Sequence, residues 1–191
     1  AWSYAKCPAE VAAPAMQESI RKAIIKEADT FIEHCSKMGY RFLRHPWAPI
    51  SWGTGAYQNW TDSSFWAYAL TGDKKYLQWI IHTCDNTLGA NPLNISYITG
   101  LGTRTVRAPL HNSRYSHFGE VAPGMQVQGP NQRGEGYQVS ETAHPKIRED
   151  FASLYTFVDC HYAIVMNEGT VVPQARTMAA FGLLLPEGDG L

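Results

Sequence analysis

Apolar residues recur at helical spacing along much of the chain, and this pattern predicts a protein built from helices. Between residues 8 and 37, apolar positions three or four apart form one stripe of a long helix. The stripe consists of Met16, Ile20, Ile24, Ala28, Phe31 and Cys35. The further helices that the pattern predicts cover 56–71, 74–88, 147–165 and 169–184. No stretch reads clearly as a strand, so the fold class that we expect is all-α.

Turn and capping residues mark the ends of several of these helices. Asp73 is a good N-cap for the helix over 74–88. The short Gly72-Asp73 turn makes the helices on either side of it antiparallel neighbours. Gly39 is expected to end the first helix. Pro173 fits the last helix only within its first turn, where its missing N–H is not needed.

Residues 89–146 differ from the rest, because Gly and Pro are frequent and no helical period persists. A loop this long in a compact domain is usually functional or disordered, and the aromatic and apolar content here argues against disorder. The side chains in it that suit ligand contacts are Arg104, Arg107, His111, Asn112, Arg114, Tyr115, His117, Asn131 and Arg133. We therefore expect this loop region to contribute to a binding site.

Composition narrows the class of function. A chain of 191 residues with 45% apolar content can form one domain with a real core. Its six Trp and ten Tyr suit stacking on sugar rings, although core packing accounts for most aromatics in proteins. A net charge of −1 without long runs of like charge argues against nucleic acid or an anionic membrane as partner. No apolar run approaches the roughly 20 residues of a membrane helix, and the first ten residues lack the features of an export signal.

Cysteine and histidine spacings indicate no metal site. The four cysteines form no C-x-x-C pair and are expected to be free, buried thiols. The seven histidines show no H-E-x-x-H or comparable spacing, and no G-x-S-x-G nucleophile motif occurs. We expect neither a metal nor a cofactor.

Glu168 is the strongest candidate for acid catalysis. Glycoside hydrolysis needs one carboxylic acid to protonate the leaving oxygen and a second carboxylate on the opposite side. Glu168 follows the apolar run Ile164-Val165-Met166, and apolar surroundings favour a protonated carboxyl. From local chemistry alone, a surface Glu stabilised at the start of a helix is the commoner case. Asp159, taken alone, is equally typical of a capping or surface residue.

Several stretches, in order along the chain, resemble the C-terminal half of the catalytic domain of glycoside hydrolase family 9, which contains many cellulases. SWGTG at 51–55, followed by ALTGDKKYL at 69–77, is similar to the family's W-G-S-N and A-x-x-L-T-G-D-x-x-Y-L. LGANPLNISYITGLG at 88–102 resembles L-G-R-N-P-L-x-x-S-Y-V-T-G-F-G and runs into RAPLHNSRYS, where the family has a P-H-H-R-type motif.

Two later segments complete the resemblance. APGMQVQGPNQ at 122–132 resembles the family's P-P-G-x-L-V-G-G-P-N. FVDCHYAIVMNEG at 157–169 is similar to Y-V-D-x-x-x-x-Y-x-x-N-E, with Phe157 and Ile164 in place of the two tyrosines. The resemblance covers residues from about 10 to 184, which is nearly the whole chain.

The resemblance implies roles for individual residues. Glu168 matches the general acid of the N-E pair, and Asp159, nine positions earlier, matches the aspartate that supports the site. His111 matches the histidine of the P-H-H-R-type motif. Arg114, offset by one or two positions from the motif's arginine, would hold sugar hydroxyls with it. We expect Trp52 and Tyr115 to be stacking platforms.

The resemblance also implies an architecture. The family fold is an (α/α)6 barrel, of which this chain would supply about the C-terminal half, with 1–191 as one portion of a single catalytic domain. The family's general base lies in a D-A-G-D-type motif that this sequence lacks. The base would therefore come from the N-terminal remainder of the domain and activate water across a gap of roughly 6.5–9.5 Å, with inversion of configuration.

The leading interpretation is a hydrolase of β-1,4-glucan that needs no cofactor, acts on oligosaccharide or polysaccharide, and is secreted or periplasmic as the family suggests. Endo action and exo action, as in a cellobiohydrolase or glucosaminidase, remain open. The main alternative is a non-catalytic sugar-binding or structural remnant of the same fold, which the missing base favours. A helical interaction domain is a third interpretation.

Overall fold

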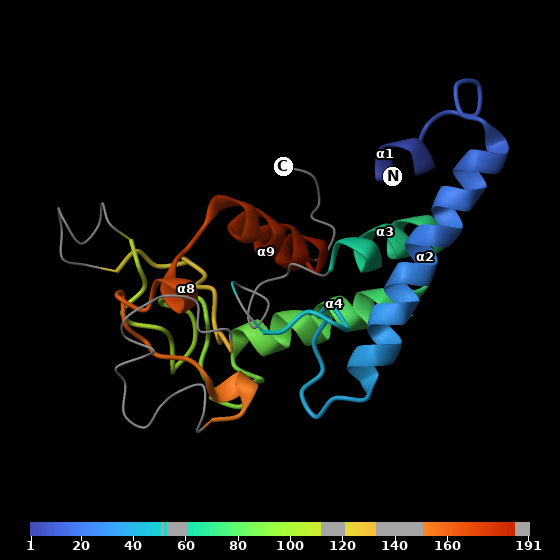
Figure 1. The fold of residues 1–191 in the computed structure, drawn as a ribbon. Helices are drawn as coiled ribbons and strands as arrows, with labels where there is room; N and C mark the ends of the chain where they lie inside the picture. The colour runs from blue at the N-terminus through green and yellow to red at the C-terminus, as the bar shows by residue number, and fades with distance from the viewer. Residues whose placement is uncertain (51, 53–60, 112–120, 133–150, 186–191) are drawn as a thin grey trace.

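The computed structural model describes residues 1–50, 52, 61–111, 121–132 and 151–185 (Figure 1). Its helices are α1 (Trp2–Ala5), α2 (Pro14–Ser36), α3 (Asp62–Thr71), α4 (Lys74–Leu88), the 3-10 helix η1 (Ser153–Tyr155), α8 (Ile164–Asn167) and α9 (Val171–Leu183). Within these described ranges there is no strand, and the β-type pairing consists of isolated bridges between loop segments. The expected all-α class is confirmed.

The described chain divides into two regions. The helical region comprises α1 to α4 and α9, in which α2 packs on α3, α3 on α4, and α4 on α9 (Figure 1). The loop region comprises residues 89–111, 121–132 and 151–170, and it gathers with α8 at the C-terminal end of α4 (Figure 1).

Helix α2 begins later than the apolar pattern indicates. Residues 8–12 form a turn in which Val11 and Ala12 both donate to the carbonyl of Pro8. The helix then starts at Pro14, because proline disfavours helical backbone at the residue before it and suits the first helical position. It ends at Ser36, three residues before Gly39. Four members of the predicted stripe, from Ile24 to Cys35, are buried.

The turn between α3 and α4 forms as its sequence predicts. Gly72 adopts a left-handed conformation with φ 70°, which glycine reaches without steric cost, and its N–H closes α3. Asp73 then caps α4 by accepting a hydrogen bond of 2.9 Å from the N–H of Lys75. Of the helix predicted over 56–71, residues 56–60 lie outside the described chain.

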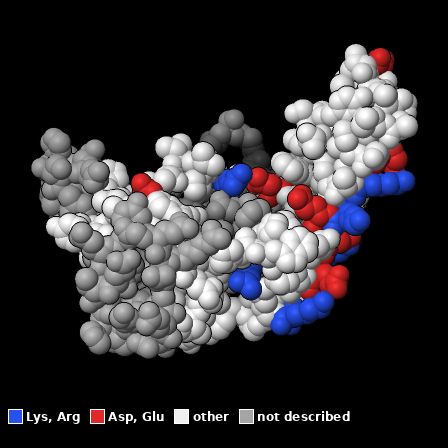
Figure 2. All heavy atoms as spheres, in the orientation of Figure 1, with Lys and Arg blue, Asp and Glu red and all other residues white. Residues whose placement is uncertain are grey.

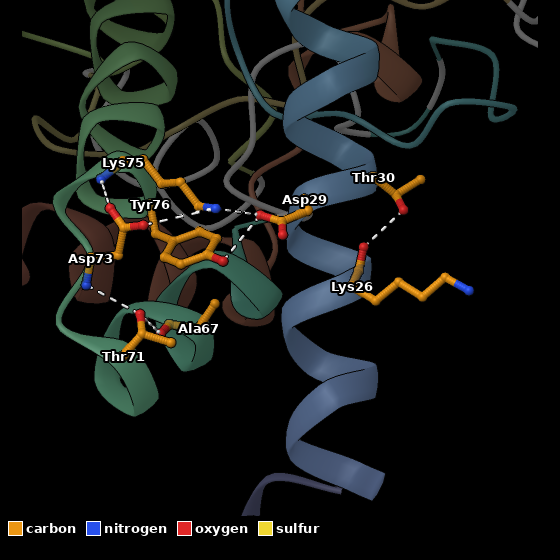
Figure 3. A network of polar contacts seen from close by, with 8 residues as sticks. All are labelled: Lys26, Asp29, Thr30, Ala67, Thr71, Asp73, Lys75 and Tyr76. Atoms are coloured by element: carbon orange, nitrogen blue, oxygen red, sulfur yellow. Dashed lines mark hydrogen bonds and ion pairs between the residues drawn. The ribbon is translucent and has the colours of Figure 1, made fainter. Parts of the chain in front are cut away.

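A polar network joins α4 to α2 (Figure 3). The Tyr76 hydroxyl donates to the Asp29 carboxylate at 3.0 Å, and the Lys75 ammonium lies 3.0 Å from the same carboxylate. This hydrogen bond to Asp29 raises the pKa of Lys75. Burial raises the pKa of Tyr76, whose side chain is almost fully enclosed between the helices. The network fixes the register of the two helices on each other.

Helix α9 returns to pack on α4. Ile80, Cys84 and Ala180 form a buried cluster between the two helices, and burial raises the pKa of the Cys84 thiol to about 12. All four cysteines are free, as expected; Cys35 and Cys84 are buried, whereas the expected burial is wrong for Cys7 and Cys160, which are partly exposed. Pro173 occupies the third position of α9, within the first turn as predicted.

The helix predicted over 147–165 is wrong for residues 151–163. The short 3-10 turn η1 is the one helical element that the structure describes in that stretch. The backbone groups of this stretch are taken by other segments. The carbonyl of Thr156 accepts from the N–H of Asn131, and that of Val158 accepts from the Asn167 side chain. These long-range bonds override the local apolar spacing that suggested a helix.

Charged side chains on the face drawn in Figure 2 lie mainly along the helical region, with acidic and basic groups close together.

Among the described helices, none has the length and apolar character needed to cross a bilayer.

Candidate active site

Segments far apart in sequence lie side by side at the centre of the loop region. The N–H of Val106 donates to the carbonyl of Ser96 at 3.1 Å, and the N–H of Val127 donates to the carbonyl of Tyr97 at 3.0 Å. Tyr97, Val106 and Val127 bury their side chains together beneath these bonds. The stretches around residues 96, 106 and 127 therefore form one packed unit.

The chain leading to Glu168 is held between two of these segments. Gly129 donates to the carbonyl of Met166, and Leu110 donates to the carbonyl of Asn167, each at 2.9 Å. Leu110 and Glu168 also form a parallel bridge. Because His111 follows Leu110 directly, its backbone runs alongside that of Glu168, so the structure brings these two predicted site residues together.

Glu168 lies at the end of α8 rather than at the start of a helix. It is the C-cap residue, with extended backbone at φ −67° and ψ 137°, and its side chain is partly buried. The alternative of a surface Glu that opens a helix is therefore wrong for this residue. Its carboxyl oxygen Oε2 lies 3.4 Å from Nε2 of Gln128, a side chain that is itself 4% exposed.

Sequence reasoning missed Gln128. Its signal is weak, since a lone glutamine in an irregular segment is most often solvated. The pattern that this segment resembles, P-P-G-x-L-V-G-G-P-N, has glycine at the position of Gln128. That departure is the one feature that could have drawn attention to it.

Asp159 connects the two segments that carry His111 and Glu168. Its carboxylate oxygens accept from the backbone N–H groups of Arg107 and Ala108, each at 2.8 Å. Charge-assisted bonds of this kind are roughly twice as strong as neutral ones. Asp159 thus anchors the loop that leads to His111, and it does so through backbone contacts from an exposed position.

Asn167 braces the backbone immediately before Glu168. Its side chain is fully buried. Its amide group donates to the carbonyl of Val158 at 2.6 Å and to that of Ala163 at 3.1 Å. These bonds add a second donor to two carbonyls that also accept from backbone N–H groups, that of Val158 from Cys160 and that of Ala163 from Met166, and they brace the turn from which the Glu168 side chain departs.

Gly169 joins Glu168 to α9 through a tightly packed position. A Cβ atom there would lie 3.0 Å from Cγ of Met125 and 3.2 Å from Nε2 of Gln174. Gln174 is itself fixed, because its amide exchanges bonds of 2.6 and 3.1 Å with the backbone of Gln126. The turn after Glu168 is therefore packed against two neighbours.

The remaining predicted site residues are less constrained by the structure. Trp52 is 38% exposed and has a left-handed backbone with φ 37°, but no described contact relates it to Glu168, so its stacking role stays a prediction. Arg114 and Tyr115 lie outside the described residues, and their roles stay predictions as well.

Three aspartates that could have served as a second carboxylate are engaged in the helical region. Asp29 pairs with Lys75, Asp73 caps α4, and Asp62 lies 3.2 Å from the guanidinium of Arg176. In the part of the chain that the structure describes, no three His, Cys, Asp or Glu side chains converge as metal ligands would.

Sequence comparison extends these observations. The model of glycosyl hydrolase family 9 matches residues 2–181. Over 168 residues the chain is 29% identical to the cellulose 1,4-beta-cellobiosidase of Acetivibrio thermocellus, covering 81% of this chain and 18% of that protein. Over 132 residues it is 30% identical to the xyloglucan-specific endo-beta-1,4-glucanase BoGH9A of Bacteroides ovatus, covering 67% of this chain and 22% of that protein. The chain thus spans about a fifth of the length of these relatives.

Solved structures give the same picture of the fold. The family 9 endoglucanase J30 superposes with a TM-score of 0.79 at 24% identity, over 95% of this chain and 32% of that one. AaCel9A in complex with cellobiose-like isofagomine superposes with a TM-score of 0.78 at 20% identity, over 96% and 35%. The helices described above are therefore part of an (α/α)6 barrel. With the family model matching nearly its whole length, the chain belongs to glycosyl hydrolase family 9.

Proposed function

We propose that this chain supplies the proton donor of an inverting β-1,4-glucan hydrolase, with Glu168 as the general acid. The observation that carries the proposal is the placement of Glu168. It is partly buried at the end of α8, and the 2.9 Å bond between Leu110 and Asn167 sets its backbone beside that of His111. A partly shielded carboxyl, on a backbone that runs beside that of a histidine able to bind a hydroxyl, supports a role in protonating a glycosidic oxygen.

In the proposed reaction, Glu168 transfers its proton to the glycosidic oxygen while the bond from that oxygen to the anomeric carbon breaks. A water molecule, deprotonated by a carboxylate base, attacks the anomeric carbon from the opposite face. The product therefore has inverted configuration. The sequence lacks the D-A-G-D-type motif that holds the base in the family it resembles, so we assign the base to the N-terminal remainder of the catalytic domain.

His111 and Arg114 are proposed to hold sugar hydroxyls, with Trp52 and Tyr115 as stacking surfaces. Asp159 is proposed to position the His111 loop through its two bonds to the backbone at residues 107 and 108. The two relatives are named for cellulose and for xyloglucan, which supports a β-1,4-glucan as substrate. One is named a cellobiosidase and the other an endoglucanase, so the names favour neither exo nor endo action.

We also propose that residues 1–191 are the C-terminal portion of one catalytic domain, whose remainder packs on α9. Val171, Met178 and Leu185 are 84%, 74% and 70% exposed. Large apolar side chains gathered on one short element in this way are typical of an interface. The chain covers about a third of each matched solved structure, which leaves enough protein to cover them.

The test uses the complete catalytic domain that contains this chain, with Glu168→Gln as the variant. We expect turnover of cellotetraose to fall on the order of a thousandfold. A dinitrophenyl β-cellobioside should be affected far less, because its leaving group departs without a proton. NMR of the first product anomers should show inversion. Glu33→Gln, at an exposed carboxylate that pairs with Lys37, is the matched control. Unchanged cellotetraose turnover in Glu168→Gln would rule out the acid assignment, and retained configuration would rule out inversion.

The absence of a D-A-G-D-type motif favours a second candidate, a non-catalytic sugar-binding remnant of the same fold. Under this alternative, calorimetry would detect cello-oligosaccharide binding by the complete protein, and Glu168→Gln would leave that binding unchanged. Any cleavage of the oligosaccharide that depends on Glu168 would exclude this candidate.

A further inference from the structure

Gln128 places a buried amide beside the carboxyl group of Glu168. The side chain is 4% exposed, and its Nε2 donates to Oε2 of Glu168 at 3.4 Å. This distance exceeds the roughly 2.9–3.0 Å of a typical N–H···O bond, so the contact orients the carboxyl more than it strengthens the fold. Catalytic hydrogen bonds are often long without substrate and shorten when it binds.

Both partners of this contact are fixed by their backbones. Val127 and Gly129, on either side of Gln128, donate to the carbonyls of Tyr97 and Met166 at 3.0 and 2.9 Å. The N–H of Glu168 donates to the carbonyl of Ile164 at 2.9 Å. Neither side chain can retreat by a shift of its own segment without breaking these bonds. The backbones that carry the amide and the carboxyl group are thus held in a fixed relation to each other.

An amide N–H can only donate, and this sets where the acidic proton resides. In a protonated carboxyl group the carbonyl-type oxygen is the better acceptor, while the hydroxyl oxygen carries the proton. Donation to Oε2 therefore favours the form in which Oε1 is protonated. We propose that Gln128 is a positioning residue, which orients the carboxyl group of Glu168 for delivery of its proton to the leaving group. This inference rests on the proposed function of Glu168.

The donor is a property of this chain and not of the pattern that its segment resembles. That pattern has glycine where Gln128 stands, and glycine offers no side-chain donor.

The test compares Gln128→Leu with the parent in the complete catalytic domain. For cellotetraose we expect kcat to fall about tenfold, the loss typical of one hydrogen bond to a charged or reacting group, with KM unchanged. Turnover of the dinitrophenyl β-cellobioside should not change. Gln132→Leu, an exposed glutamine of the same segment, should match the parent on both substrates.

A double variant separates this inference from the proposed function. If Gln128 acts through Glu168, adding Gln128→Leu to Glu168→Gln costs no further activity. Equal losses on both substrates, or an additive loss in the double variant, would overturn the positioning role. The proposed function would still stand if Glu168→Gln loses turnover of cellotetraose but keeps most of its turnover of the dinitrophenyl β-cellobioside. If Glu168→Gln does not show this difference between the substrates, the proposed function fails instead.

A second variant keeps the inference testable if Gln128→Leu does not fold. Gln128→Glu preserves shape and places a like charge beside Glu168, which favours the protonated acid. We expect the basic limb of its pH profile to move to higher pH than that of the parent. An unmoved basic limb would contradict a contact between the two side chains in the working enzyme.

Discussion

The helical region and the loop region are held together by different forces. Between α4 and α9, Ile80, Cys84 and Ala180 form an apolar cluster in which close packing provides the stability. Around Glu168, the loop region combines small apolar clusters, such as that of Ala163, Val165 and Met166, with single backbone bonds between distant segments, such as the one from Gly129 to Met166. The first arrangement tolerates small shifts as long as volume is conserved, whereas the second loses a directional contact with each shift. We infer that stability resides mainly in the helices and that the precision of the site resides in the loops.

The largest expected effect on stability follows from emptying the helical cluster. Ile80→Ala removes methyl and methylene groups from a fully buried position between α4 and α9. We expect the free energy of unfolding to fall by about 2–5 kcal/mol, measured by denaturant unfolding, and Ile80→Val to lose only about 0.5–1.5 kcal/mol. At denaturant concentrations at which the variants are still folded, their pH profiles of cellotetraose hydrolysis should match that of the parent. A shifted profile would mean that the two regions are coupled.

A smaller and more local effect is expected in the loop region from Asn167→Leu. The variant removes two side-chain hydrogen bonds, to the carbonyls of Val158 and Ala163, which keep their backbone donors, at a cost of about 1–3 kcal/mol for the pair. Hydrogen exchange should accelerate over residues 156–168 while α2 and α4 stay protected. Turnover should fall because the backbone before Glu168 loosens.

Asn91 provides the matched control for that variant. Its buried amide also donates to two carbonyls, those of Asn86 and Ile95, at 2.7 and 2.9 Å. Asn91→Leu should therefore lose a similar amount of stability and leave the pH profile of turnover unchanged. Equal effects of the two variants on turnover would argue against a specific role of the Asn167 turn.

The smallest effect concerns the polar network that joins α4 to α2. The folded-state pKa values of Lys75 and Tyr76 are raised, so their contribution is present below the unfolded pKa values and is lost as pH rises through the folded ones. We expect the parent to lose stability between pH 9 and pH 11 and Asp29→Asn to lose less over that range. At pH 8 the two should differ by less than about 1 kcal/mol, since the Lys75–Asp29 pair is half-exposed. Urea unfolding of both proteins at pH 8, 9 and 11 measures these differences. The same pH dependence of stability in the parent and in Asp29→Asn would contradict the prediction.

The same contrast explains which features the sequence could predict. The register of α2, α4 and α9 follows from local apolar spacing, and Asp73 and Pro173 occupy the positions that their chemistry indicates. The stretch over 151–163 shows the opposite case. Its apolar spacing suggested a helix, but Asn131 and Asn167 bind its carbonyls from outside. Partners that distant leave no trace in a local period.

The candidate site follows the same rule. The neighbouring placement of His111 and Glu168 depends on the Leu110–Asn167 bond, which spans more than fifty residues, and only the motif resemblance anticipated it. Gln128 could not be assigned in that way, because the pattern has no side chain at its position. Residues that act through a long-range contact specific to this chain become visible only in three dimensions.

The crowded joint at Gly169 has a consequence for altering this protein. Its φ lies outside the left-handed range, so the backbone would accept alanine, and the obstacle is the space filled by Met125 and Gln174. Shortening Met125 would open that space, and a methyl group at 169 could then fill it. Positions 125 and 169 are therefore sterically coupled. A search that varies them one at a time would discard a pair of substitutions that is tolerated only in combination.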